Sequence, residues 1–87
     1  MRQIYAFTAS WCKPCNMLKP VLRKLEEEGV KIKYFDADDN VIAKKYRIST
    51  IPTLVYMDND IEYSRTQGLI RKQTILENYN RGVDIDG

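Results

Sequence analysis

The chain reads Trp11-Cys12-Lys13-Pro14-Cys15 where an apolar run ends and a helical pattern begins, and this stretch holds both of its cysteines. Two thiols separated by two residues can close into a disulfide and open again. Cys12 is expected at or just before the first helical turn, where unpaired backbone N–H groups and the helix dipole favour negative charge. The stretch therefore predicts a thiol–disulfide switch in which Cys12 attacks and Cys15, about one helical turn later, resolves.

Two residues between the cysteines are expected to tune the reactive thiol. Lys13 brings a positive charge near Cys12, and Pro14 stiffens the first helical turn, where its missing N–H costs nothing. A fall in the thiol pKa from about 8.5 to about 7 would raise the thiolate fraction at pH 7 from roughly 3% to about half. A thiolate of low pKa also leaves a mixed disulfide more readily.

Two other uses of a cysteine pair fit the sequence less well. A four-residue ring stabilises a fold by only about 2 kcal/mol in the chain-entropy estimate, less than a disulfide across a long loop. A closed zinc site needs four ligands, whereas this pair supplies two and the chain has no histidine. The absence of histidine also excludes Ser-His and Cys-His hydrolytic arrangements. We therefore predict no metal and no cofactor.

Length and composition predict one small globular domain over residues 1–87. Apolar residues are 44% and charged residues 30% of the chain, which is typical of soluble folded proteins. The net charge is only +2, and no basic run exceeds two residues, so nucleic-acid binding is not expected. No apolar stretch approaches the length of a membrane span. With neither a signal peptide nor a glycosylation sequon recognised, a cytoplasmic location is expected.

The pattern of apolar residues predicts alternating strands and helices. We expect strands over residues 3–8, 30–35, 53–57 and 61–66, and helices over 13–28, 41–46 and 71–79. The first two strands are joined by a helical crossover and should be parallel, whereas the last two form a hairpin through the polar turn at residues 58–60. The order β-α-β-α-β-β-α predicts an α/β fold with a four-stranded mixed sheet flanked by helices.

A second motif, Ser49-Thr50-Ile51-Pro52-Thr53, precedes the third expected strand. A proline there is by itself only a signal for the start of a strand. Together with the upstream Trp-Cys-x-Pro-Cys, however, it makes nearly the whole chain resemble the thioredoxin family. The matching pieces are residues 9–15, Pro20, Asp36 and Asp38, residues 46–48, residues 50–54, and Gly68.

The resemblance implies a fold, a client site and a set of partners. The fold would be thioredoxin-like, with a cis Ile51-Pro52 bond that brings Pro52 against the dithiol. The backbone of Thr50 and Ile51 would pair with an extended client strand, and Trp11 would flank Cys12. A monomeric protein-disulfide reductase is implied, with disulfide-containing proteins as clients and thioredoxin reductase or a similar electron donor as its partner. Electron transport and cell redox homeostasis would be its cellular role.

The chain also departs from the family pattern. Ala6 and Tyr34 stand where thioredoxins usually carry a buried acid and a lysine, Lys13 replaces a glycine, and Thr8 replaces a common tryptophan. The usual N-terminal strand and helix are missing, as in the trimmed core of glutaredoxins. Two alternatives therefore stay open at this point. One is a glutaredoxin-like reductase that depends on glutathione, and the other is a non-catalytic binding module that uses the apolar surface around Trp11 and Pro52.

Overall fold

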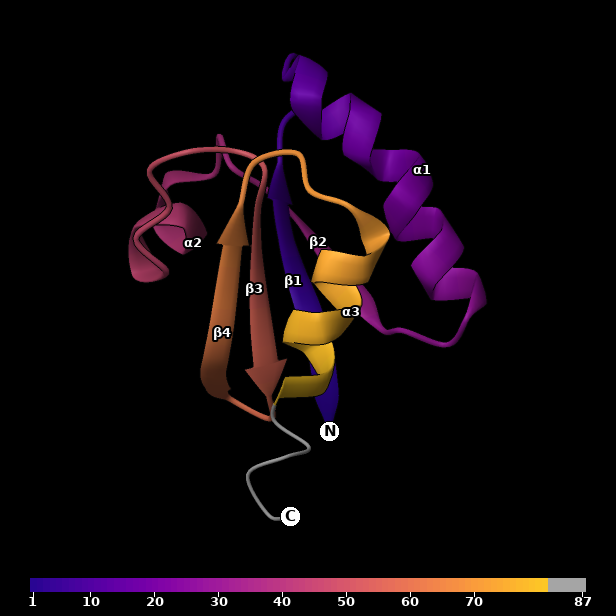
Figure 1. Ribbon diagram of the computed structural model, residues 1–87. Coiled ribbons are helices and arrows are strands. Elements are labelled where there is room, and N and C mark those ends of the chain that lie inside the picture. Colours follow the sequence, from indigo (N-terminus) through magenta and orange to yellow (C-terminus); the bar gives the residue numbers. More distant parts are fainter. Residues whose placement is uncertain (82–87) are drawn as a thin grey trace.

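The computed structural model describes residues 1–81, apart from the side chain of Asn40. The predicted domain, 1–87, therefore includes a C-terminal segment that lies outside this description. The elements follow the predicted order β-α-β-α-β-β-α (Figure 1): β1 (Arg2–Thr8), α1 (Lys13–Glu27), β2 (Ile32–Asp36), α2 (Asn40–Lys45), β3 (Thr53–Asp58), β4 (Ile61–Gln67) and α3 (Lys72–Asn80).

The four strands form one mixed sheet in the order β2-β1-β3-β4. β1 pairs with β2 in parallel and with β3 antiparallel, and β3 pairs with β4 antiparallel as a hairpin. This pairing confirms the predicted four-stranded mixed sheet. Because β1 and β3 are central, their side chains are buried on both faces, and both strands carry long apolar runs.

Each face of the sheet has its own apolar core. On one face, Ile4, Ala6 and Tyr56 pack with the buried stripe of α1, Leu18, Leu22 and Leu25, and with Ile75 of α3. On the other face, Phe7, Val55 and Met57 pack under Ile42 of α2 and the aromatic rings of Tyr5, Phe35 and Tyr46. The helical stripe has the three- and four-residue spacing of an amphipathic helix, which explains why this segment is helical and buries that side.

The element bounds differ from the predicted ones by a single residue at most ends, and by two at the start of β2. Val30 was predicted to open that strand, but β2 begins at Ile32. Gly29 takes a left-handed backbone conformation with φ of 96°, and the Val30 N–H then donates to the carbonyl of Leu25 at 3.0 Å. Val30 is buried as part of the turn that closes α1, so its apolar side chain serves the core without belonging to the sheet.

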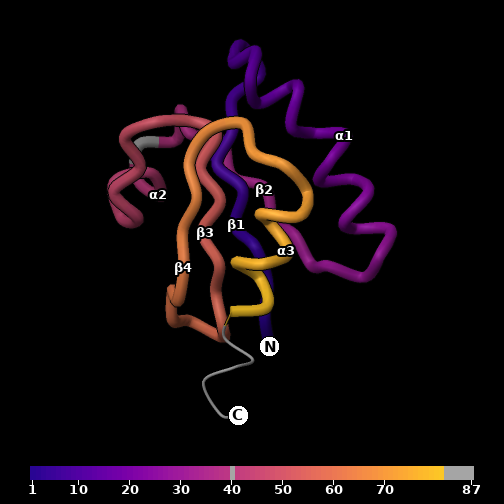
Figure 2. Tube along the Cα trace, in the orientation of Figure 1, coloured from indigo at the N-terminus to yellow at the C-terminus, as the bar shows by residue number. Residues whose placement is uncertain are grey.

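Several connections meet at one end of the sheet. The start of α1, the chain that enters β3 and the chain that leaves β4 lie together at that end (Figure 2). The N–H of Gly68, after β4, donates to the carbonyl of Pro52, before β3, at 2.8 Å. Residues far apart in the sequence are thereby brought to the first turn of α1.

Candidate active site

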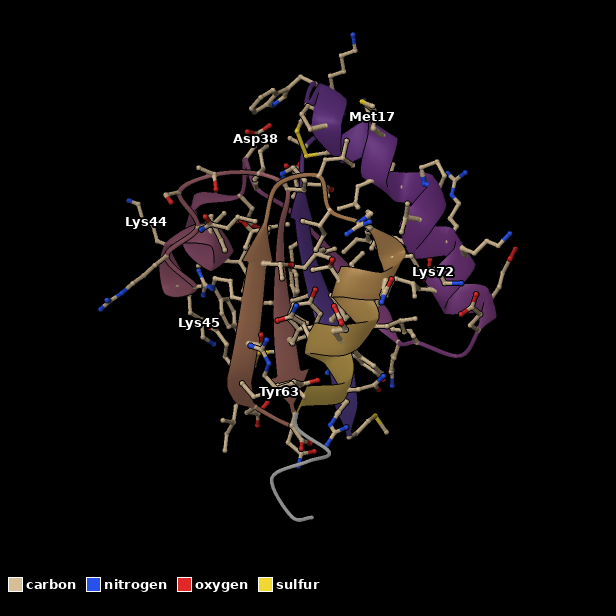
Figure 3. The ribbon with its side chains drawn as sticks, viewed as in Figure 1. Met17, Asp38, Lys44, Lys45, Tyr63 and Lys72 are labelled. Atoms are coloured by element: carbon tan, nitrogen blue, oxygen red, sulfur yellow. A yellow bond between two sulfur atoms is a disulfide. The ribbon has the colours of Figure 1, made fainter. Side chains whose placement is uncertain are left out.

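Cys12 and Cys15 form a disulfide at the N-terminus of α1, with their Cα atoms 5.2 Å apart. Figure 3 shows the two sulfur atoms joined beside the start of α1. Cys12 is the N-cap residue, and the backbone N–H of Cys15 donates to Cys12 Sγ at 3.3 Å. Cys12 is 4% exposed and Cys15 is fully buried, so the more exposed of the two residues is the predicted nucleophile.

The position of Cys12 explains how the fold can favour its thiolate. The first N–H groups of a helix have no partner within the helix, and one of them here faces the sulfur. A thiolate at that point accepts a charge-assisted hydrogen bond and lies at the positive end of the helix dipole. Lys13 and Pro14 occupy the first helical positions, as the sequence predicted, and both are exposed.

The segment before β3 closes over the cysteine pair. The Ile51-Pro52 peptide bond is cis, as the resemblance implied. The Ile51 carbonyl oxygen lies 3.9 Å from Cys12 Sγ, and Ile51 packs against the small buried cluster of Ala9, Cys12 and Cys15. Thr53 donates its hydroxyl hydrogen to the carbonyl of Thr50 at 2.6 Å, which fixes the turn that presents Thr50 and Ile51.

Trp11 extends into solvent beside the disulfide and is 68% exposed. Its indole Nε1–H donates to Asp38 Oδ2 at 3.0 Å, so the ring is held although it is exposed. A hollow of about 180 Å³ lies next to it, lined by Trp11, Ala37, Asp38 and residues 48–51. The structure thus brings Trp11, Thr50 and Ile51 to one groove, and it adds Asp38, which the sequence had indicated only as a matching piece.

Comparison with known proteins decides the family. The thioredoxin family model matches residues 2–81. The chain belongs to the thioredoxin family. The thioredoxin of Chlamydia caviae is 40% identical over 78 residues, which cover 86% of this chain and 76% of that protein. The thioredoxin of Rickettsia bellii is 33% identical over 81 residues, which cover 88% and 77%. A mutant thioredoxin from Halobacterium salinarum has a TM-score of 0.86 at 27% identity, covering 92% of this chain and 73% of that one.

Membership of the thioredoxin family and the Cys12–Cys15 disulfide together make this chain a thiol–disulfide oxidoreductase. The pair stores two electrons as two thiols and releases them when the disulfide forms. Neither the glutathione-dependent alternative nor the non-catalytic one is favoured by the relatives, which are named thioredoxins.

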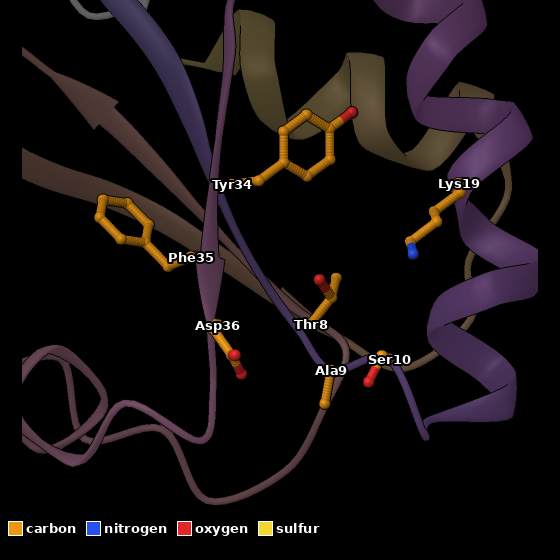
Figure 4. Close-up of a pocket in the computed structure, with 7 residues that line it drawn as sticks. All are labelled: Thr8, Ala9, Ser10, Lys19, Tyr34, Phe35 and Asp36. Carbon is orange, nitrogen blue, oxygen red and sulfur yellow. The ribbon is translucent and has the colours of Figure 1, made fainter.

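The departures from the thioredoxin pattern have structural consequences near the dithiol. Ala6, at the position of the usual acid, is fully buried in the apolar core with Leu18 and Leu22. A second hollow has a volume of about 250 Å³, and Ala9, one of the residues that line it, also belongs to the buried cluster of the two cysteines. Figure 4 shows Lys19 reaching from α1 toward Thr8, with the ring of Tyr34 opposite. Thr8, which stands where the family commonly has a tryptophan, is one of the residues that line this hollow.

Residues 1–81 show neither a metal-binding cluster nor a helix able to span a membrane. In that part of the chain, no group of three or more His, Cys, Asp or Glu side chains is arranged to hold a metal ion. None of the helices described there combines the length and the apolar character that crossing a bilayer requires.

Proposed function

We propose that this member of the thioredoxin family works as a reductant of disulfides in client proteins. The single observation that carries the proposal is the position of Cys12 Sγ, which accepts the Cys15 N–H at 3.3 Å and lies 3.9 Å from the Ile51 carbonyl. The nucleophilic sulfur is therefore next to both an anion-stabilising amide and a backbone segment that can receive a client strand.

The reaction runs in two thiol–disulfide exchanges. The Cys12 thiolate attacks one sulfur of the client disulfide, forms a mixed disulfide, and releases the first client thiolate. Cys15, having lost its proton, then attacks Cys12 Sγ and releases the second client thiolate. The client gains two electrons, and the dithiol of the chain becomes the Cys12–Cys15 disulfide. Each departing thiolate takes a proton from solvent.

The client site consists of four residues in this proposal. Trp11 forms one wall beside Cys12, and the backbone of Thr50 and Ile51 pairs with an extended client segment next to Pro52. Pairing of this kind recognises the main chain and tolerates many side chains. Lys13 and Pro14 tune the dithiol through charge and stiffness. The groove that Trp11, Thr50 and Ile51 line together supports the client-binding roles of these three residues.

Partners and location follow from the same proposal. Thioredoxin reductase or a similar donor would return the disulfide to the dithiol, and disulfide-containing proteins would be the clients. Family membership supports both. The chain would act as a monomer in the cytoplasm, where it would take part in electron transport and cell redox homeostasis.

Reduction of insulin or of dithionitrobenzoate tests the proposal directly. The wild-type chain, supplied with electrons by a thioredoxin reductase, should reduce both compounds. Cys12→Ser should abolish turnover, because the one thiol left in the first turn of α1 is that of the fully buried Cys15. Cys15→Ser should instead accumulate a mixed disulfide between Cys12 and the client, detectable as an adduct by mass spectrometry.

Three results would contradict the proposal. The first is wild-type turnover by Cys12→Ser, and the second is failure of Cys15→Ser to form the adduct. The third is turnover that requires glutathione and not a thioredoxin reductase, which would replace the electron donor that we propose.

A further inference from the structure

Arg65 lies on β4, at the edge of the sheet, and reaches toward the end of α2. It pairs with Val55 of β3, whose side chain belongs to the core under α2. The Arg65 side chain is therefore on the α2 face of the sheet and is partly buried there. The client-site residues Thr50 and Ile51 follow α2 in the chain, so Arg65 touches the start of the segment that leads to them.

A local irregularity of β4 brings Glu62 to the same face. Residues three apart in a regular strand point to opposite faces. The register between β3 and β4 shifts at Tyr56 and Met57, so Glu62 faces Met57 while Arg65 faces Val55. Glu62 then accepts two hydrogen bonds from Arg65, at 2.8 Å from Nε and 2.9 Å from Nη2. The carboxylate fixes the plane of the guanidinium.

The fixed guanidinium donates to the carbonyls at the end of α2. Arg65 Nη2 donates to the carbonyl of Tyr46 at 2.8 Å, and Nη1 reaches the carbonyl of Arg47 at 3.5 Å. Tyr46 is the C-cap residue of α2. The last carbonyls of a helix have no partner within it, and a cation there is favourable.

The chain turns sharply at this point. Arg47 has a φ of 54°, in the left-handed region that residues other than glycine seldom adopt. The N–H of Ile48 then donates back to the carbonyl of Ala43 at 2.9 Å. At its other end, the segment is held by the bond from Thr53 to Thr50 and by the bond from Gly68 to Pro52. Tyr46 and Ile48 pack its first end against the sheet, and Arg65 adds hydrogen bonds from β4 to the backbone there.

We propose that Arg65 is a positioning residue for client binding, oriented by Glu62 and acting through the carbonyls of Tyr46 and Arg47. It fixes the backbone conformation of residues 47–52, and this conformation places the backbone of Thr50 and Ile51 beside Cys12, where a client strand can pair with it. Arg65 touches neither the client nor the sulfurs. The inference rests on the proposed function, because it assumes that a client strand pairs with Thr50 and Ile51.

The charge and shape of arginine are both needed for this role. A guanidinium offers five N–H donors in one plane, which lets it serve Glu62 and two carbonyls together, whereas a lysine ammonium is a point charge on a flexible stem. Arg65→Ala removes every contact, and Arg65→Lys keeps the charge. Glu62→Gln keeps the size of the residue but removes the charge that orients the guanidinium. Arg23→Ala, on the exposed side of α1, is the matched control because it removes an equal charge elsewhere.

The experiment compares a protein disulfide with a small disulfide in single turnovers. The pre-reduced chain is mixed with increasing excess of a tryptophan-free protein client or of dithionitrobenzoate, and oxidation is followed by the fluorescence of Trp11, the single tryptophan. For Arg65→Ala, we expect the half-saturating concentration of the protein client to rise about three- to ten-fold, with the limiting rate and the dithionitrobenzoate rate within about twofold of wild type. For Arg65→Lys and Glu62→Gln, the half-saturating concentration of the protein client should lie between the wild-type value and that of Arg65→Ala. Arg23→Ala should have the wild-type value.

Two outcomes overturn the inference. In one, Arg65→Ala keeps the wild-type half-saturating concentration for the protein client. In the other, it slows both disulfides equally, which marks a general loss of structure. Failure of the proposed function looks different, since the wild-type chain itself would then not reduce the protein client, or Cys12→Ser would retain turnover.

Discussion

The single tryptophan of the chain is exposed and yet held in place. Trp11 donates its indole N–H to Asp38, whose own backbone N–H donates to the carboxylate of Asp36 at 2.9 Å. The loop after β2 thereby fixes an aromatic ring next to Cys12. An aromatic side chain that is rigid before binding offers contact area at a low cost in conformational entropy. We infer that Asp38 keeps the client groove in its binding shape.

Removal of the Asp38 carboxylate should free the ring. In Asp38→Ala, we expect a lower fluorescence anisotropy of Trp11 and stronger quenching by iodide, because the side chain loses its hydrogen bond to the carboxylate and samples more rotamers. Asp60→Ala, an exposed change in the turn between β3 and β4, serves as the control and should leave both values unchanged. Unaltered anisotropy in Asp38→Ala would show that packing alone holds the ring.

At the scale of elements, the sequence was informative wherever local chemistry decides the structure. The spacing of Leu18, Leu22 and Leu25 predicts α1, and the cysteine motif predicts where that helix begins. Val30 was misassigned because an apolar residue after Gly29 fits a strand pattern equally well. Its N–H is used in the turn that ends α1, and apolar periodicity does not report backbone hydrogen bonds.

The parts of the site that were missed depend on contacts between distant residues. Trp11 and Asp38 are 27 positions apart, and Arg65 and Tyr46 are 19 apart. An arginine on an exposed strand is an ordinary surface residue in the sequence. Its role follows only from the register shift in β4 and from the approach of α2 to that edge. By contrast, the pairing of Cys12 with Cys15 could be predicted from a short motif, and the cis bond before Pro52 from the resemblance to the thioredoxin family.

At the scale of the whole molecule, burial in the core shifts the pKa of a tyrosine side chain. Tyr56 lies on β3, fully buried between the sheet and α3, and its hydroxyl pairs with that of Thr66 at 2.9 Å. Burial raises the pKa of Tyr56 to about 12, since a phenolate in the core would lose its hydration. The protein should therefore be sensitive to strongly alkaline solution.

The direction of that sensitivity follows from proton binding. Between the unfolded pKa of about 10 and the folded value, the unfolded chain has lost the Tyr56 proton while the folded chain keeps it. The free energy of unfolding should thus fall as the pH rises from 10 to 12. Urea unfolding of the oxidised chain across this range measures it, and Tyr56→Phe should show a shallower decline. An equal decline in wild type and variant would assign the effect to other groups.

The function proposed for this chain requires that the first turn of α1 hold Cys12 as a thiolate in the reduced state. The most direct measurement is the pH dependence of iodoacetamide alkylation in the reduced Cys15→Ser variant, where Cys12 is the only thiol and the backbone N–H of residue 15 is retained. We expect the alkylation rate to reach half its maximum at a pH well below the pKa of about 8.5 of an ordinary cysteine, and urea unfolding to move this midpoint back to about 8.5. A folded chain whose midpoint already equals that of the unfolded chain would contradict the account.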